Sequence, residues 1–268
     1  MLVGAGRMGG ALLKGWVALG LGPIAVVEPA PNAEIRHFAR RPGIRFLNGV
    51  EDAAGLHVTS CVIALKPQIL RIEVGRFRPI AASGALMLSI AAGTSLAALH
   101  RAWGRRASIV RAMPNTPGAA GRGITALYAP PRIPAALRAR AEALVARLGE
   151  TIWVRREGLI DAVTAVSGSG PAYVFLMAEC LARAARAQGF PAAIADRLAR
   201  ATISGAGALL DADPRAPEAL RRDVASPGGT TEAALAVLMK DDALGKLMAD
   251  AVVAARARAV ELRRESEH

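Results

Sequence analysis

The sequence has very few of the residues that cross-link small domains or bind metal ions. Its 268 residues include only two cysteines, Cys61 and Cys180, and four histidines. Two cysteines so far apart give no metal-ligand spacing and no disulfide framework. Because both lie in apolar segments, we expect two buried free thiols in a reducing cytoplasm, and we expect no metal site.

Aromatic residues and lysines are also scarce. Aromatics make up 4% of the chain and lysine occurs four times, so arginine carries most of the positive charge behind the net charge of +12. A charge of this size is typical of proteins that bind nucleic acids or anionic membranes. Single-strand binding would also want aromatic side chains among the arginines, and we find no such arrangement. We interpret the arginines as helix-surface residues that help to attract an anionic cofactor, and expect neither nucleic acid nor membrane as a partner.

The chain has no uninterrupted apolar run of the roughly 18 to 20 residues that span a membrane. The longest candidate, 85–99, is broken by serine, glycine and threonine. The first residues lead directly into a folded-domain motif and not into a signal peptide, which predicts a cytoplasmic protein. Only three residues precede Gly4, whereas a buried strand usually has about five or six, so we expect the true start to lie upstream.

Residues 1–156 alternate between strand-like and helix-like segments, an order typical of a doubly wound parallel sheet. Strand patterns occupy 1–3, 24–28, 61–65, 86–90, 108–111, 124–129 and 151–154, and helical patterns occupy 8–19, 33–40 and 134–148. Farther along, the strand patterns stop and helical patterns cover 160–188, 191–211, 215–223, 229–239 and 241–265. We expect a dinucleotide-binding domain over 1–156 and a helical domain over 157–268.

The helical segment 172–187 carries apolar residues on more than one face. Such a helix is usually covered on several sides. This pattern favours a partner subunit, with packing inside one chain as the alternative.

The segment Gly4-Ala5-Gly6-Arg7-Met8-Gly9 is a G-x-G-x-x-G motif between an apolar strand and a helix. In a dinucleotide-binding fold the first glycine permits a tight turn, the second lets the pyrophosphate approach, and the third lets helix and sheet pack closely. The context therefore predicts a nucleotide cofactor.

Two further groups lie where strands are expected to end. Glu28 follows the second strand at the spacing of a carboxylate that hydrogen-bonds the ribose 2′-hydroxyl of NAD. Nearby arginines at 36, 40 and 41 would instead favour a 2′-phosphate, so the choice between NADH and NADPH stays open. Lys66-Pro67 follows another strand, where a lysine can reach cofactor hydroxyls or phosphates.

The segment Ser226-Pro227-Gly228-Gly229-Thr230-Thr231 precedes an apolar helical pattern. A turn with glycines and hydroxyls at a helix start presents unpaired N–H groups to a carboxylate or phosphate. It therefore predicts capture of a small anionic substrate.

Five motifs occur in order along essentially the whole chain: Gly4–Gly9, Ala64–Gln68, Arg111–Pro117, Ser167–Tyr173 and Val224–Thr231. Together they closely resemble the pyrroline-5-carboxylate reductases, and the last three motifs are quite specific. The resemblance implies a Rossmann N-terminal domain and an all-α C-terminal dimerisation domain like that of 6-phosphogluconate dehydrogenase. It also implies homodimers through the helical domain, often assembled into a larger ring such as a decamer.

The resemblance implies that NADPH or NADH and 1-pyrroline-5-carboxylate bind to the predicted sites. The substrate carboxylate would contact Ser226, Gly228, Gly229, Thr230 and Thr231. Thr231 would act as the catalytic residue by contacting the ring nitrogen, and Glu157 matches an acidic residue near the substrate. The predicted cofactor-binding residues are Gly4, Ala5, Gly6, Arg7, Met8, Gly9, Glu28, Ala64, Lys66, Pro67 and Asn115.

The family pattern is not matched clearly in two places. Asp223 stands where many members have asparagine, which puts one cofactor contact in doubt. Asn48 and Glu51 both compete for a position that often contacts the cofactor, and the sequence does not decide between them.

The motifs contain no histidine or cysteine, which suits hydride transfer to the carbon of a protonated imine. Three alternative functions share parts of this pattern. A β-hydroxyacid dehydrogenase would need a lysine base on the long helix, and 160–188 contains none. An imine reductase for another cyclic imine and a non-catalytic NAD(P)-binding sensor are the remaining alternatives.

Overall fold

The computed structural model describes residues 1–267, which form two compact units. Unit 1 consists of Met1–Ser169 together with the chain from Ala255 onward, and unit 2 consists of Gly170–Ala254. The compact units thus divide at 169/170 and 254/255. The domain boundary predicted after residue 156 stays a prediction.

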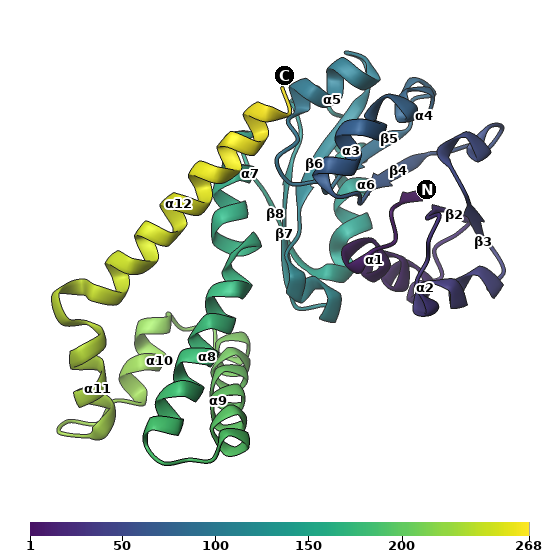
Figure 1. Cartoon of the computed structure of the whole chain (residues 1–268). Helices are drawn as coiled ribbons and strands as arrows, with labels where there is room; N and C mark the ends of the chain where they lie inside the picture. The colour runs from purple at the N-terminus through teal and green to yellow at the C-terminus, as the bar shows by residue number, and fades with distance from the viewer. Residues whose placement is uncertain (268) are drawn as a thin grey trace. The chain divides into compact units, whose positions relative to one another are not determined.

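Unit 1 contains one eight-stranded sheet in the order β3-β2-β1-β4-β5-β6-β7-β8. This order runs outward in both directions from β1 and β4, as in doubly wound dinucleotide-binding folds. The predicted α/β architecture is confirmed (Figure 1). The strands are β1 Leu2–Val3, β2 Ile24–Val27, β3 Ile44–Leu47, β4 Ser60–Ile63, β5 Leu86–Ser89, β6 Ser108–Met113, β7 Gly123–Tyr128 and β8 Gly149–Trp153.

Helices cover both faces of the sheet because strand side chains alternate between them. Leu2 belongs to a core with residues of α1 and α6, whereas Val3 belongs to a core with residues of α3, α4 and α5. The helices are α1 Arg7–Ala18, α2 Ala33–His37, α3 Pro67–Glu73, α4 Arg78–Ala82, α5 Leu96–Trp103, α6 Ala135–Val145 and α7 Gly158–Val163, with a π-helical segment η6 at Thr164–Gly168.

One strand pair corrects the expectation of a parallel sheet. β7 runs antiparallel to β6, whereas the other neighbouring strands are parallel. A parallel pair needs a crossover of about a dozen residues or more. The connection 114–122 holds only the 3₁₀ turn η4, Thr116–Ala120, so the chain reverses direction.

The central strand β1 is only two residues long. The α-amino group of Met1 is buried beside it and donates to the Ser60 carbonyl oxygen at 2.7 Å. Burial lowers the pKa of this amino group below its ordinary value.

Unit 2 is built from helices: α8 Gly170–Ala187, α9 Ala192–Ala212, α10 Pro217–Asp223, α11 Thr230–Leu238 and the first part of α12 Ala243–Glu265. α8 and α9 pack side by side (Figure 1). Large apolar side chains nevertheless face outward, among them Phe175, which is 63% exposed, and Leu176, which is 58% exposed. A single copy of this unit leaves an extensive apolar surface uncovered.

The helical run Gly158–Ala187 is long and apolar enough to cross a membrane by length and composition, and 17% of its most apolar window is buried. One such helix does not by itself distinguish a membrane span from a helix that packs against another subunit.

The two cysteines differ in their surroundings. Cys61 lies buried in β4, as expected, and burial raises the pKa of its thiol to about 12. The prediction was wrong for Cys180, which is exposed because α8 buries only Ala182 within this chain.

Candidate functional site: a dinucleotide-binding sheet edge and an anion-binding turn

The glycine loop after β1 has the space and backbone geometry that its motif predicts. Gly4 has φ +86°, and a Cβ there would lie 2.8 Å from the Ala64 carbonyl oxygen. A Cβ on Gly9 would lie 2.0 Å from the Gly4 carbonyl oxygen, so α1 and β1 are packed too closely for any side chain. A Cβ on Gly6 would meet nothing within 4 Å, which leaves open space in front of the helix N-terminus.

The carboxyl ends of β1 and β4 bring several predicted cofactor residues together. The two strands are neighbours, and the Ala64 N–H donates to the Val3 carbonyl oxygen at 2.8 Å. Lys66 is exposed and precedes the first turn of α3, where Pro67 is the first helical residue. The strand order changes direction between β1 and β4, which is where ligands bind in open α/β sheets.

Glu28 lies directly after β2 and is bonded to the glycine loop. Its Oε2 accepts the N–H of Ala5 at 2.8 Å, and its Oε1 accepts the N–H of Ala30 at 3.2 Å. The carboxylate therefore links the end of β2 to the predicted pyrophosphate loop. Sequence spacing placed Glu28 near the loop, but the direct bond to Ala5 could not be read from it.

Asn115 follows β6, and its side chain is hydrogen-bonded to the start of β7. Its Oδ1 accepts the N–H of Ile124 at 3.0 Å, and a Cβ on Gly123 would lie 2.7 Å from the same oxygen. Asn115 thereby holds the start of β7 against the turn after β6. A cofactor contact by Asn115 stays a prediction.

Glu157 is the partner of a buried arginine in unit 1. Its Oε1 accepts from Arg111 Nη1 at 2.7 Å and from the Leu96 N–H at the start of α5, also at 2.7 Å. The Arg111 side chain is 2% exposed, so this carboxylate neutralises a charge that would otherwise be buried without a partner. The predicted substrate role of Glu157 is untested, whereas its contacts show a structural one.

A second buried ion pair was missed by sequence reasoning. Arg263 Nε on α12 donates to Asp161 Oδ2 on α7 at 2.8 Å, and the Asp161 side chain is 3% exposed. This bond raises the pKa of Arg263. The pair ties the C-terminal end of α12 to unit 1.

The contacts of Asn48 and Glu51 differ. Both carboxylate oxygens of Glu51 accept from Arg76, with Oε1 at 2.7 Å from Nε, and this pairing lowers the pKa of Glu51 to about 2. Asn48 lies directly after β3, where its N–H donates to Asp52 Oδ2 at 3.0 Å. Glu51 is committed to an ion pair, which leaves Asn48 as the better candidate for the cofactor.

The motif Ser167–Tyr173 begins in the π-helical segment. The Ser169 N–H donates to the Thr164 carbonyl oxygen at 2.8 Å, five residues earlier, and the Ser169 hydroxyl donates to the same oxygen. A Cβ on Gly168 would lie 2.9 Å from Met113 Cε, so this glycine permits close packing against the end of β6. Segments of this kind often occur at functional sites.

The turn at Ser226–Thr231 lies in unit 2 and opens α11, as predicted. Gly228 has φ +68°, and Gly229 is the residue before the first helical position. The Gly229 N–H donates to the Ser226 carbonyl oxygen at 2.9 Å, and the Gly228 N–H donates to Glu232 Oε2 at 2.6 Å. Two of the N–H groups predicted to bind the substrate are thus bonded within the chain.

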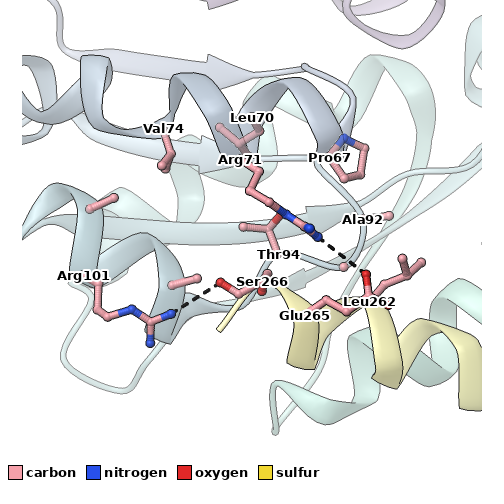
Figure 2. Close-up of a pocket in the computed structure, with 13 residues that line it drawn as sticks. Pro67, Leu70, Arg71, Val74, Ala92, Thr94, Arg101, Leu262, Glu265 and Ser266 are labelled. Atoms are coloured by element: carbon pink, nitrogen blue, oxygen red, sulfur yellow. Dashed lines mark hydrogen bonds and ion pairs between the residues drawn. The ribbon is translucent and has the colours of Figure 1, made fainter. Parts of the chain in front are cut away.

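A cavity of about 420 Å³ lies beside the predicted cofactor edge in unit 1 (Figure 2). Arg71 pairs with Glu265 at 3.7 Å, and Arg101 donates to the Ser266 carbonyl oxygen at 3.4 Å. Pro67 is the wall residue that also belongs to the predicted cofactor set. Because both arginines bond to the C-terminal end of the chain, the cavity walls anchor that end. Among residues 1–267, no group of three or more His, Cys, Asp or Glu is arranged to hold a metal ion.

Comparisons with known proteins agree with the sheet and the helical unit. A family model described as pyrroline-5-carboxylate reductase dimerisation matches residues 157–262. The pyrroline-5-carboxylate reductase of Pseudomonas aeruginosa is 37% identical over 87% of this chain and 85% of its own length. The solved Coxiella burnetii pyrroline-5-carboxylate reductase is 32% identical, covers 97% of both chains and gives a TM-score of 0.88.

A second solved structure carries information on the cofactor. The Plasmodium falciparum pyrroline carboxylate reductase, with NADP bound, is 25% identical, covers 98% of this chain and 97% of its own, and gives a TM-score of 0.81. The similarity extends over both compact units and over 85% to 97% of each relative's length. The chain therefore belongs to the pyrroline-5-carboxylate reductase family.

Proposed function

We propose that this protein reduces 1-pyrroline-5-carboxylate to L-proline with NADPH or NADH, as a pyrroline-5-carboxylate reductase of proline biosynthesis. The observation that carries the proposal is identity above 30% to reductases of this name over most of their length. The glycine loop, which has the geometry of a dinucleotide site, supports it independently of the names.

The residues at the edge of the sheet fit a dinucleotide. Gly6 leaves room for a pyrophosphate at the N-terminus of α1, and the first turn of this helix contains no acidic residue to repel it. We assign the cofactor to the glycine loop Gly4–Gly9 and to the neighbouring strand ends, with Asn48 preferred over Glu51. The bound nicotinamide supplies a hydride. The strand-end residues assigned to the cofactor are Glu28, Ala64, Lys66, Pro67 and Asn115.

The turn in unit 2 would hold the substrate carboxylate. The N–H groups in the first turn of a helix lack intrahelical acceptors, and Thr230 and Thr231 are the first residues of α11. Their N–H groups and hydroxyls, with the Ser226 hydroxyl, can donate to a carboxylate. In this proposal Gly228 and Gly229 shape the turn while the residues after them contact the substrate.

Reduction of the protonated imine needs no strong acid, because the nitrogen already carries its proton. The hydride adds to the carbon of the C=N bond, and the π electron pair moves to the nitrogen, which keeps its proton as an amine. A hydroxyl at Thr231 would accept that N–H and fix the ring for transfer. Alignment and exclusion of water then supply most of the rate enhancement.

A substrate panel tests this function and separates it from an imine reductase of different specificity. Purified protein is assayed with pyrroline-5-carboxylate and with 1-pyrroline, which lacks the carboxylate, using each cofactor in turn. We expect kcat/KM to be about 100-fold or more higher for the carboxylate, because two or more charged hydrogen bonds would be lost without it. Equal rates with both imines would favour the other imine reductase, and no oxidation of either cofactor would favour a sensor.

We further infer that the protein works as a homo-oligomer built on residues 157–262. The matched dimerisation family and the exposed apolar side chains of α8 and α9 support this. A ring of dimers such as a decamer, and a cytoplasmic location, belong to the same proposal.

A further inference from the structure

The turn before α11 is closed by bonds within the chain. Gly228 adopts a left-handed backbone conformation at φ +68°, which side-chain-bearing residues rarely adopt. Its N–H donates to Glu232 Oε2 at 2.6 Å, across the start of the helix. The next N–H, that of Gly229, donates back to the Ser226 carbonyl oxygen at 2.9 Å.

These bonds divide the N–H groups of the turn into two sets. The N–H groups of Gly228 and Gly229 donate to acceptors within the chain. The Ala233 N–H donates to the Gly229 carbonyl oxygen at 3.2 Å within the helix. The N–H groups of Thr230, Thr231 and Glu232 occupy the first three helical positions, where no intrahelical acceptor exists. Only this second set remains available to a ligand anion.

The position of Glu232 explains how the turn keeps this division. A glutamate at the third helical position commonly accepts the N–H of the residue before the helix, in a capping box. Here the Glu232 carboxylate accepts the N–H of Gly228, one residue farther from the helix, because the Gly229 N–H already donates to the Ser226 carbonyl oxygen. A carboxylate is favoured at this end of the helix dipole, so the bond is charge-assisted.

We propose that Glu232 is a positioning residue for the substrate-binding turn. By holding Gly228 it presents Thr230 and Thr231 to the substrate carboxylate in a preformed arrangement. This inference rests on the proposed function. If the Glu232 carboxylate instead competed with the substrate carboxylate for the turn, removing it would lower KM.

Three substitutions at position 232 separate geometry from charge. Glu232→Ala removes the acceptor, and Glu232→Asp keeps the charge on a side chain too short to reach Gly228. Glu232→Gln removes the charge but keeps an oxygen that accepts the N–H. Glu218→Ala is the matched control, because Glu218 is also an acidic residue in the first turn of an exposed helix, α10.

We expect KM for pyrroline-5-carboxylate to rise about 10-fold in the Ala and Asp variants, with kcat within about twofold, since one charge-assisted hydrogen bond orders the turn. The Gln variant should show a smaller rise, within about threefold of the wild type, because its neutral oxygen still accepts the Gly228 N–H but without the charge. The Glu218 control should match the wild type. A KM that is unchanged or lower in the Ala variant overturns the inference, as does an Asp variant that behaves like the wild type. If the Ala variant is unstable in thermal melting, the KM values of the Asp and Gln variants are compared instead. A wild-type protein without activity would instead refute the proposed function.

Discussion

The proposed chemistry depends on single residues, and on Thr231 most of all. It is half-buried in the first turn of α11, next to the turn that the chain's own bonds hold in shape. Glu28 has a comparable place in unit 1, where it is bonded to the glycine loop. Each residue can be changed without removing a large part of the core.

Replacing Thr231 by alanine should lower kcat/KM for pyrroline-5-carboxylate by about 10- to 1000-fold, the range seen when one positioned polar group is lost. Steady-state kinetics with saturating cofactor provide the measurement. Thr202→Ala is a suitable control, because this exposed threonine on α9 bonds only to its own helix at Leu198. Near-wild-type kinetics for Thr231→Ala would remove the residue from the mechanism.

Replacing Glu28 by serine should shift cofactor preference toward NADPH. The carboxylate repels a 2′-phosphate and accepts from a ribose hydroxyl, so the ratio of kcat/KM for NADPH to that for NADH should rise about 10-fold. The control is Glu34→Ser, because Glu34 is an exposed acid on α2 that pairs with Lys14. An unchanged ratio would mean that Glu28 only supports the glycine loop through Ala5.

At the scale of elements, two buried ion pairs connect segments that are distant in the sequence. Arg111 on β6 meets Glu157 before α7, and Asp161 on α7 meets Arg263 on α12. Breaking such a pair from one side is costly because the remaining charge stays buried.

Glu157→Ala should therefore lower the free energy of unfolding by about 3–5 kcal/mol, since it leaves Arg111 buried without its partner. Glu157→Gln should cost less, because its amide oxygen can still accept the Leu96 N–H. Denaturant unfolding measures both, with the exposed Glu150→Ala expected within about 0.5 kcal/mol of the wild type. A stable Glu157→Ala protein with a raised KM would favour the substrate role over the structural one.

The sequence allowed most of the sheet to be predicted, since strand patterns and the glycine spacing are local signals. β3 was missed because its short, mostly half-exposed segment Ile44–Leu47 lacks a clear alternation. The antiparallel β7 was missed because direction depends on the connection before it. The ion pairs of Arg111 and Asp161 join residues 46 and 102 positions apart, and no local pattern encodes such pairs.

The candidate site was predictable to a similar extent. The glycine loop, the strand-end residues and the turn before α11 were identified from local motifs, and the structure describes them at the expected elements. The bond from Gly228 to Glu232 was not foreseen, because a cap between these positions depends on the left-handed backbone of Gly228. The contacts that distinguish Asn48 from Glu51 likewise required the position of Arg76.

At the scale of the whole molecule, the exposed apolar side chains of unit 2 require a covering surface. Phe175→Asp combined with Leu176→Asp should convert an oligomer into monomers and abolish most activity, because charges cannot be buried at an apolar interface. Sedimentation velocity measures the mass, and Arg140→Glu on the exposed surface of α6 serves as the charge-change control. Wild-type protein that sediments as a monomer would contradict the proposed oligomer.

The proposed reaction is direct hydride transfer from a nicotinamide to the imine carbon of pyrroline-5-carboxylate. A cofactor that carries deuterium at both nicotinamide C4 hydrogens, followed by mass analysis of the product, tests this reaction. We expect L-proline that carries one deuterium on the carbon that belonged to the C=N bond. Proline without the label, or no product with either NADPH or NADH, would contradict it.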